Sequence, residues 1–204
     1  MLEPYLSELC SRGIVLASGS RVRQNLLRQI ELPFTLQVSG FAEDADWRTF
    51  ENPKEYALFN ARNKAKCIET DSIVISADTV AEVNGVVLEK PVDADDARRM
   101  IGLWNGGICL MHTAVVVKGK STNESVCTTE IEFDVLSDEV VDYYIRSNEW
   151  EGASGAIVVE KKCCSTFIKK FNGCFNNVMG LPLNALCNML IQEIKNSRTE
   201  NSIS

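Results

Sequence analysis

An aspartate follows a strongly apolar segment near the middle of the chain. Residues 72–77 (SIVISA) form a nearly continuous apolar run, typical of a strand buried on both faces, and the run ends at Asp78 and Thr79. Open α/β sheets bind ligands in the crevice at such strand ends. A carboxylate there can hold Mg²⁺ or take a proton from an attacking water. The alternative is an aspartate that only opens a turn.

A second candidate site follows the first predicted strand, residues 14–17. The Ser-Gly-Ser turn after it precedes a segment with helical spacing of apolar residues. A helix that starts there offers free backbone N–H groups and the positive end of its dipole. The hydroxyls of Ser18 and Ser20 and the guanidinium groups of Arg21 and Arg23 complete a possible phosphate cradle. The alternative is a capped helix start that faces solvent.

Three further charged residues are candidates for the same chemistry. Lys90 precedes Pro91, which fixes the chain there, and a lysine is a suitable point charge for a phosphate. Lys64 lies in a predicted helix, and Glu43 lies in the acidic, polar segment 39–52, which predicts a loop. Taken singly, each is more often a solvated surface residue.

The histidine and the cysteines point away from nucleophilic or zinc chemistry. His112 lies inside an apolar run, where a satisfied core histidine is the simpler interpretation. The eight cysteines include no CxxC pair and there is one histidine, so a structural zinc site is not expected. A chain of 204 residues can build a core without disulfides, so we expect reduced thiols.

These residues are carried by alternating strands and helices. Such alternation predicts an α/β fold with a mixed, twisted sheet flanked by helices. Weak boundaries near 39–52 and 118–124 suggest two lobes around a central cleft, within a single domain over 1–195 that is followed by a flexible tail, 196–204. The expected strands are 14–17, 34–38, 72–77, 80–83, 86–88, 110–117, 129–135 and 166–171, and the expected helices start after 20 and span 53–67, 93–104, 137–147 and 183–194.

Composition and charge limit the function further. Hydrophobic residues are 45% of the chain and charged residues 24%, as in a globular protein. The net charge of −7 makes nucleic acid an unexpected partner but allows a small anion held by local cations. No apolar run is long enough to span a bilayer and the N-terminus lacks the pattern of a secretory signal, so we expect a cytoplasmic protein with no membrane partner.

Together these segments resemble one family over about residues 12–194. The chain is similar to the Maf family of nucleotide pyrophosphatases. The resemblance rests on LASGSRVRQNLL at 16–27, FAE at 41–43, NARNKA at 60–65, SADTV at 76–80, LEKPVD at 88–93, HTAVVV at 112–117 and FNGCFNNVMGLPL at 171–183.

The resemblance implies a fold, a reaction and a set of roles. It implies two lobes that flank a cleft (a Maf/ITPase-like architecture), cleavage of a nucleoside triphosphate between its α and β phosphates, a divalent metal (Mg²⁺ or Mn²⁺), a cytoplasmic location and a homodimer. Asp78 matches the base that activates water, and Glu43 matches the acidic residue near the metal that Asp78 also contacts. The residues that match the family's phosphate-binding groups are Ser20, Arg23, Lys64 and Lys90. We add Ser18, which belongs to the predicted phosphate cradle.

Three positions linked to base choice in the family leave the substrate open. Thr79 agrees with the branch that acts on dTTP and UTP, Glu160 agrees with the branch that acts on 7-methyl-GTP, and Val22 agrees with neither. We expect dTTP and UTP, with 7-methyl-GTP as the alternative. Changes from the family pattern at 21, 22, 153, 157 and 160 also leave open a nucleotide-binding regulator that has lost turnover.

Overall fold

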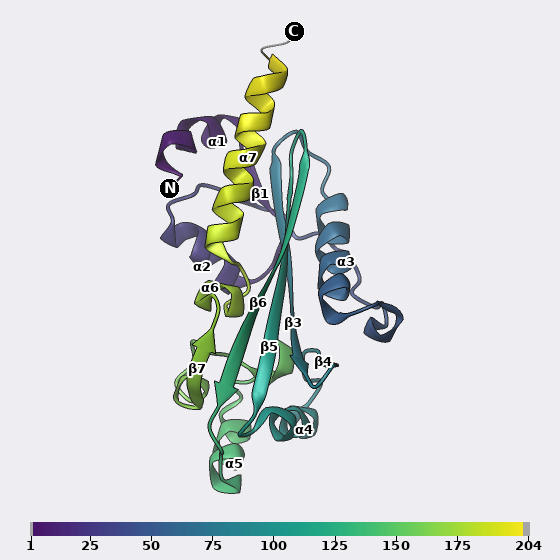
Figure 1. Cartoon of the computed structure of the whole chain (residues 1–204), viewed down its shortest axis with the longest axis vertical. Helices are drawn as coiled ribbons and strands as arrows, with labels where there is room; N and C mark the ends of the chain where they lie inside the picture. The colour runs from purple at the N-terminus through teal and green to yellow at the C-terminus, as the bar shows by residue number, and fades with distance from the viewer. Residues whose placement is uncertain (1, 202–204) are drawn as a thin grey trace.

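The computed structural model describes residues 2–201, and within them seven strands form one mixed sheet flanked by helices, as the sequence predicts (Figure 1). The strand order is β2-β1-β3-β5-β6-β7, with β4 paired to β3. The strands are β1 (Ile14–Leu16), β2 (Thr35–Leu36), β3 (Ile73–Val83), β4 (Val86–Leu88), β5 (Ile108–Lys118), β6 (Thr122–Phe133) and β7 (Ile168–Asn172). The α-helices are α1 (Leu6–Arg12), α2 (Arg21–Gln29), α3 (Pro53–Lys66), α4 (Ala94–Trp104), α5 (Asp138–Ser147), α6 (Phe175–Val178) and α7 (Leu183–Asn201), and the 3-10 helices are η1 (Glu3–Tyr5), η2 (Trp47–Thr49), η3 (Ser154–Ala156) and η4 (Cys164–Thr166).

Side-chain caps fix where helices α2 and α3 begin. The Ser20 hydroxyl accepts the Arg23 amide at the start of α2, over 3.4 Å. The Asn52 side chain accepts two amides of the first turn of α3, over 3.0 and 3.1 Å, and Pro53 occupies the first helical position, as expected from the sequence. These caps set the register in which the later residues of α2 and α3 face the sheet.

The two faces of the sheet bury alternate residues of each strand. On one face, Val74 and Val80 of β3 and Ala114 and Val116 of β5 pack against α3. On the other face, the intervening residues pack against helices from both ends of the chain. Figure 1 shows α3 on one side of the central strands and α2 and α7 on the opposite side.

The face opposite α3 carries two separate hydrophobic clusters. The α7 cluster contains Ala77 of β3 and Val115 of β5, with side chains from α1, α2 and α7. The α4 cluster contains Ala81 of β3 and Met111 of β5, with side chains from α4 and α5. Between them on the same face lie Thr79 and its cross-strand partner Thr113. Polar residues therefore mark the position where one cluster ends and the other begins.

Strand β3 differs from the prediction at the residues that matter most. We expected one strand over 72–77 and another over 80–83, with a turn at Asp78 as the alternative to a ligand site, but β3 runs unbroken from Ile73 to Val83. The reason is β5, which pairs with β3 continuously from Val74 to Glu82. Strand β6 likewise starts at Thr122 rather than at 129, since it pairs with β5 over that whole length.

The connection between β5 and β6 and the end of the last helix also differ from expectation. Residues 118–122 form a tight hairpin turn, where we expected a weak domain boundary. Helix α7 continues to Asn201, so residues 196–201 of the expected tail are helical, and residues 202–204 lie outside the described part. Arg12 donates to the buried Ser197 hydroxyl over 2.8 Å, which ties this last stretch of α7 to α1.

A buried carboxylate attaches α7 to the β5–β6 turn. The fully buried Glu193 accepts the amides of Lys120 and Ser121 (2.7 and 3.1 Å) and the Ser121 hydroxyl (2.5 Å), and it pairs with Arg12 at 2.9 Å. Burial alone would raise the pKa of Glu193, but these hydrogen bonds outweigh it and hold the pKa below its usual 4.5. Among residues 2–201, no helix combines the length and apolar character needed to cross a bilayer.

We predict that Glu193→Gln lowers the free energy of unfolding at pH 7 by about 2 kcal/mol, because the amide NH₂ would face existing donors. Since the folded pKa is depressed, the stabilisation is present above pH 4.5 and is lost as the pH falls through the folded value. Urea unfolding between pH 3 and 7 should therefore show the variant approaching the wild type in acid. A constant difference at all pH values, or an equal loss in the exposed control Glu151→Gln, would contradict this role.

Candidate active site

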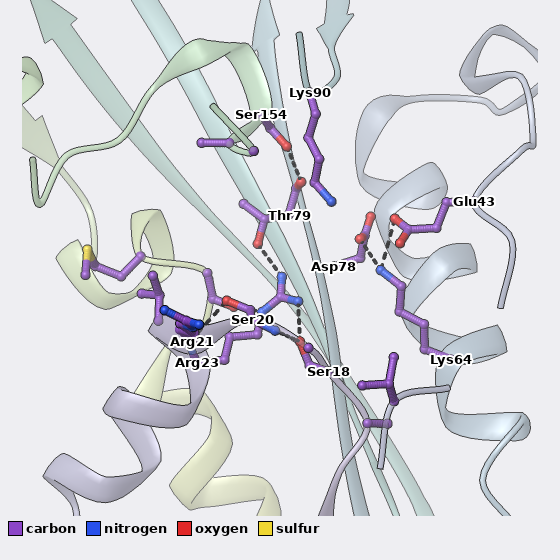
Figure 2. Close-up of a pocket in the computed structure, with 18 of the residues that line it drawn as sticks. Ser18, Ser20, Arg21, Arg23, Glu43, Lys64, Asp78, Thr79, Lys90 and Ser154 are labelled. Carbon is purple, nitrogen blue, oxygen red and sulfur yellow. Dashed lines mark hydrogen bonds and ion pairs between the residues drawn. The ribbon is translucent and has the colours of Figure 1, made fainter. Parts of the chain in front are cut away.

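A cavity of about 640 Å³ opens where one edge of β3 has no strand beside it. Strand β1 pairs with β3 only as far as Ile75, and β4 begins to pair at Ala81. This interval of β3 therefore has one backbone edge without a neighbouring strand, and two of its residues line the cavity. Asp78 and Thr79 point to opposite faces of the sheet, yet both line the cavity (Figure 2).

The structure brings all the site residues predicted from the sequence to this cavity. They come from β1–α2, the loop before α3, α3, β3, the segment after β4 and the segment after η3. They are Ser18, Ser20, Val22, Arg23, Glu43, Lys64, Asp78, Thr79, Lys90 and Glu160. Residues separated by more than 140 positions in the sequence thus line one cavity. Their roles in that cavity stay predictions.

One side of the cavity is a cluster of two carboxylates around an ammonium group. The Lys64 Nζ lies 2.6 Å from Asp78 Oδ1 and 3.1 Å from Glu43 Oε2 (Figure 2). The side chains of Lys64 and Asp78 are 9% and 8% exposed, whereas Glu43 is 38% exposed. The ammonium therefore neutralises a nearly buried carboxylate and holds a second, more accessible one next to it.

Asn60 holds the other oxygen of Asp78. Its amide nitrogen donates to Asp78 Oδ2 over 3.1 Å, and the side chain is buried. Asn60 and Lys64 lie one turn apart on the face of α3 that packs on β3, so one helix positions both oxygens of the carboxylate. Asp78 thus has a fixed orientation before any ligand arrives.

Aromatic contacts place the loop that carries Glu43. The Phe41 ring meets Phe59 of α3 edge-on, with centroids 6.2 Å apart, and Phe50 lies 5.0 Å from the same ring. These contacts anchor the loop on both sides of Glu43. The loop is therefore attached to the same helix that supplies Lys64.

The other side of the cavity is built around Arg23, whose partners are all neutral. Its guanidinium donates to Gly180 O (2.7 Å), Ser18 Oγ (3.1 Å) and Thr79 Oγ1 (3.0 Å). Burial lowers the pKa of Arg23, and the charges of Asp78 and Glu43 oppose that effect. These bonds use three of the roughly five N–H groups of a guanidinium. The remaining N–H groups can donate to an anion in the cavity.

Gly180 makes room for this arginine. Its φ is +94°, and a Cβ there would lie 3.3 Å from Thr79 Oγ1 and 3.4 Å from Arg23 Nε. A side chain at this position would be strained by the backbone and would press on the guanidinium. The glycine before Leu181 therefore belongs to the site, although it makes no contact through a side chain.

Lys90 and the segment after η3 complete the cavity wall. Figure 2 shows Lys90 extending toward Asp78 from the side opposite Arg23. The Ser154 hydroxyl donates to the Thr79 carbonyl over 2.9 Å, and the Gly155 amide donates to the Glu89 carbonyl over 2.9 Å. These bonds place η3 against β3 and against the residue before Lys90, and Glu160, in the segment after η3, also lines the cavity.

His112 and the cysteines take no part in this cavity. His112 is 1% exposed, and its ring nitrogens lie 2.7 Å from Glu82 and 2.9 Å from Thr128, as the interpretation of a satisfied core histidine requires. Burial lowers the pKa of His112, and the hydrogen bond to Glu82 opposes that effect. Within residues 2–201 all eight cysteines are free thiols, and burial raises the pKa of Cys109 and Cys164 to about 12.

The donor set fits a divalent cation that a ligand helps to hold. No group of three or more histidine, cysteine or acidic side chains that could hold a metal occurs among the described residues. Glu43 and Asp78, however, both contact one ammonium nitrogen, so their oxygens lie close together. Mg²⁺ is commonly bound by one or two carboxylates together with phosphate oxygens and water. These two carboxylates match that pattern.

Sequence reasoning did not assign roles to four residues that shape the site. Asn60 could have been found from its four-residue spacing to Lys64 on one helix face. Ser154, Gly180 and Thr113 reach the site only through the folded arrangement of distant segments, and no local pattern marks them. Ser154 donates to the Thr79 carbonyl, and Thr113 lies within hydrogen-bond distance of the Thr79 hydroxyl. Gly180 leaves room for that hydroxyl because it has no side chain.

Comparison with known proteins places the chain in a family. The family model for Maf-like proteins matches residues 13–193, nearly the whole chain. The chain belongs to the Maf family. This Maf-like chain is 35% identical over 185 residues to a dTTP/UTP pyrophosphatase of Clostridium beijerinckii, covering 87% of this chain and 97% of the relative. It is also 35% identical over 175 residues to a dTTP/UTP pyrophosphatase of Salmonella typhimurium, covering 83% and 87%.

A human relative is much longer than the Maf-like chain. It is named a probable bifunctional dTTP/UTP pyrophosphatase/methyltransferase protein and is 31% identical over 210 residues. The match covers 94% of this chain but only 34% of the human protein. Among solved structures, the Ham1 protein of Staphylococcus aureus aligns with a TM-score of 0.41 at 18% identity, covering 59% of this chain and 71% of that chain.

We predict that Lys64→Met destabilises the protein by about 3 kcal/mol, because it leaves the nearly buried Asp78 carboxylate without its cation. Adding Asp78→Asn removes the unpaired charge, so the double variant should be more stable than Lys64→Met alone. Chemical unfolding of the wild type, both single variants and the double variant, in the presence of a chelator, measures this coupling. Additive losses in the double variant would show that the pair is not coupled.

Proposed function

We propose that this Maf-like protein is a nucleoside triphosphate pyrophosphatase that hydrolyses the bond between the α and β phosphates, with dTTP and UTP as its substrates. The products are a nucleoside monophosphate and pyrophosphate. The observation that carries the proposal is the convergence of Arg23, Lys64 and Lys90 with the carboxylates of Glu43 and Asp78 on one cavity. The names of the bacterial relatives support the same activity.

The electrostatics of the cavity suit a triphosphate. A triphosphate carries about four negative charges, and its cleavage builds further charge on the leaving pyrophosphate, which cations must stabilise. Arg23 and Lys90 approach from different sides of the cavity, and the first residues of α2 line the same space. The cavity volume of about 640 Å³ lies within the range of about 300–1,000 Å³ that is usual for small-molecule sites.

Asp78 is the residue we assign to proton removal from water. The water oxygen attacks the α phosphorus, its proton passes to a carboxylate oxygen of Asp78, and the bond from the α phosphorus to the bridging oxygen breaks, so that pyrophosphate leaves. Lys64 and Asn60 each use one lone pair of that carboxylate, and a carboxylate offers about four. Asp78 can therefore accept a proton without losing the contacts that orient it.

Glu43 and Asp78 are the residues we propose as ligands of a Mg²⁺ or Mn²⁺ ion, with substrate phosphate oxygens completing its shell. When bound, such an ion would neutralise phosphate charge and lower the pKa of a bound water. Lys64 contacts both carboxylates in the structure, so it offsets one of their two negative charges before the ion and the substrate arrive. Glu43 is the more exposed of the two carboxylates and is the one that can adjust.

One observation favours a second candidate substrate. Glu160 lines the cavity, and its carboxylate can only accept hydrogen bonds. A guanine edge offers an N–H and an amino group to such an acceptor, whereas a uracil edge has one N–H between two carbonyls. The alternative substrate is therefore 7-methyl-GTP, which the experiments below distinguish from dTTP and UTP.

We also propose that the protein acts in the cytoplasm, as a homodimer and without a nucleic-acid partner. The location and the dimer follow from the family resemblance, and the net charge of −7 argues against binding a long polyanion. Sedimentation of the purified chain measures the oligomeric state.

We predict that wild-type protein with Mg²⁺ or Mn²⁺ releases pyrophosphate from dTTP and UTP and that Asp78→Asn lowers kcat by about 10²–10⁴-fold, the usual contribution of a positioned base. The panel should include CTP and 7-methyl-GTP. Asn at 78 keeps the size of the side chain, so the fold, checked by circular dichroism, should be unchanged. A folded wild type that binds nucleotides tightly but releases no pyrophosphate would instead support a regulator without turnover.

We predict that Glu160→Gln raises the ratio of kcat/KM for UTP to that for 7-methyl-GTP by about tenfold, because an amide can donate to a uracil carbonyl and a carboxylate cannot. The exposed Glu151→Gln, which lies nearby in the sequence and outside the cavity lining, is the matched control. An unchanged ratio would show that Glu160 does not face the base.

A further inference from the structure

A chain of hydrogen bonds leads from the cavity into the core. The Arg23 guanidinium lies 3.0 Å from the Thr79 hydroxyl, which lies 3.0 Å from the Thr113 hydroxyl. The Thr113 hydroxyl in turn donates to the backbone carbonyl of Asn177 over 2.8 Å. Thr79 is half-buried and lines the cavity, whereas Thr113 and Asn177 are fully buried behind it.

The chemistry at both ends of this chain fixes the direction of its protons. A guanidinium can only donate, so Thr79 accepts from Arg23. A carbonyl can only accept, and the single proton of the Thr113 hydroxyl is used for Asn177. The contact between the two hydroxyls therefore requires Thr79 to donate to Thr113. The reverse arrangement, with Thr113 donating to Thr79, forms one hydrogen bond fewer inside the protein.

The far end of the chain is held in place by further bonds. The Asn177 side chain donates to the Met111 carbonyl (2.9 Å) and to the Thr129 hydroxyl (3.0 Å). The Asn177 carbonyl also accepts the Gly180 amide over 2.9 Å. The carbonyl that accepts the Thr113 proton is therefore fixed relative to β5 and β6. Because Thr113 must donate to this carbonyl, Thr79 must donate to Thr113.

We propose that Thr113, which touches no ligand itself, is a specificity-determining residue that acts through Thr79. Because the proton of Thr79 is used inside the protein, its hydroxyl offers only a lone pair to the cavity. The group of the nucleotide that meets Thr79 must then be a donor, either the N–H of the base or a hydroxyl of the ribose. This inference rests on the proposed function for the identity of the ligand.

The test compares ligands in which one donor is replaced by an acceptor. The parent is the non-hydrolysable α,β-methylene analogue of dTTP. The first analogue carries O4-methylthymine, whose N3 accepts rather than donates while the oxygen at C4 is kept, and the second carries a 3′-fluorine in place of the 3′-hydroxyl. Calorimetry should show that one of the two binds wild-type protein about tenfold more weakly than the parent, and which one it is identifies the donor as base or ribose.

In Thr113→Val the Thr79 proton loses its acceptor and can turn toward the ligand, so the discrimination should shrink at least threefold. Thr113→Ser keeps the hydroxyl and should keep the discrimination. The Asn177 carbonyl retains the Gly180 amide in both variants, so a general loss of fold, monitored by thermal unfolding, is not expected. If Thr113→Val does not fold, Thr79→Val replaces it, and the discrimination should shrink in the same way.

Two outcomes overturn the inference: wild-type protein that binds both analogues as tightly as the parent, or a folded Thr113→Val with unchanged discrimination. Hydrolysis of dTTP and UTP is measured in parallel. Wild-type protein that binds the analogues as predicted but hydrolyses no triphosphate would contradict the proposed function and leave the role of Thr113 supported. Absence of binding by the parent would contradict both.

Discussion

The shortness of β1 is the constraint on which the site depends. A strand inside a sheet normally has both backbone edges paired, and a side chain on it reaches only one face. Since β1 pairs with β3 no further than Ile75 and β4 starts at Ala81, a short stretch of β3 is left open on one edge. Residues on opposite faces of that stretch, Asp78 and Thr79, can then meet the same ligand.

The open edge divides the chemistry into two halves. On the α3 side, Asn60 and Lys64 orient the Asp78 carboxylate and balance its charge. On the other side, Thr79 lies where the α7 cluster ends and the α4 cluster begins, so a polar hydroxyl and Arg23 take the place of apolar packing. The residue that we propose as the base and the cation that we propose to bind phosphate are thus held on opposite faces of β3.

Electrostatic balance before substrate binding follows from the same arrangement. A buried carboxylate is costly without a cation, and a buried guanidinium is costly without an anion. Lys64 is the cation that pairs with the Asp78 carboxylate. Arg23 has only neutral hydrogen-bond partners, and the carboxylates of Asp78 and Glu43 act on it without direct contact. An incoming polyanion would therefore supply the counter-charge that the hydrogen-bond partners of Arg23 do not provide.

The sequence predicted the class of fold and the membership of the cavity better than the local structure around Asp78. Caps at Asn52 and Ser20 and the apolar run of residues 72–77 are local signals, and they identified α2, α3 and the start of β3. The predicted break between strands 72–77 and 80–83 was wrong, because pairing with β5 is a long-range effect that keeps the chain extended through Asp78. Thr113 was unpredictable for the same reason, since its role depends on a cross-strand neighbour and on a carbonyl 64 positions away.

The most direct test of this account is a crystal structure of the protein with α,β-methylene-dTTP and Mg²⁺. The account predicts phosphate oxygens in contact with Arg23 and Lys90, the α phosphorus next to Asp78, and the nucleoside extending past Thr79 toward Glu160. A triphosphate bound away from the open edge of β3, or bound there with Asp78 remote from the α phosphorus, would contradict it.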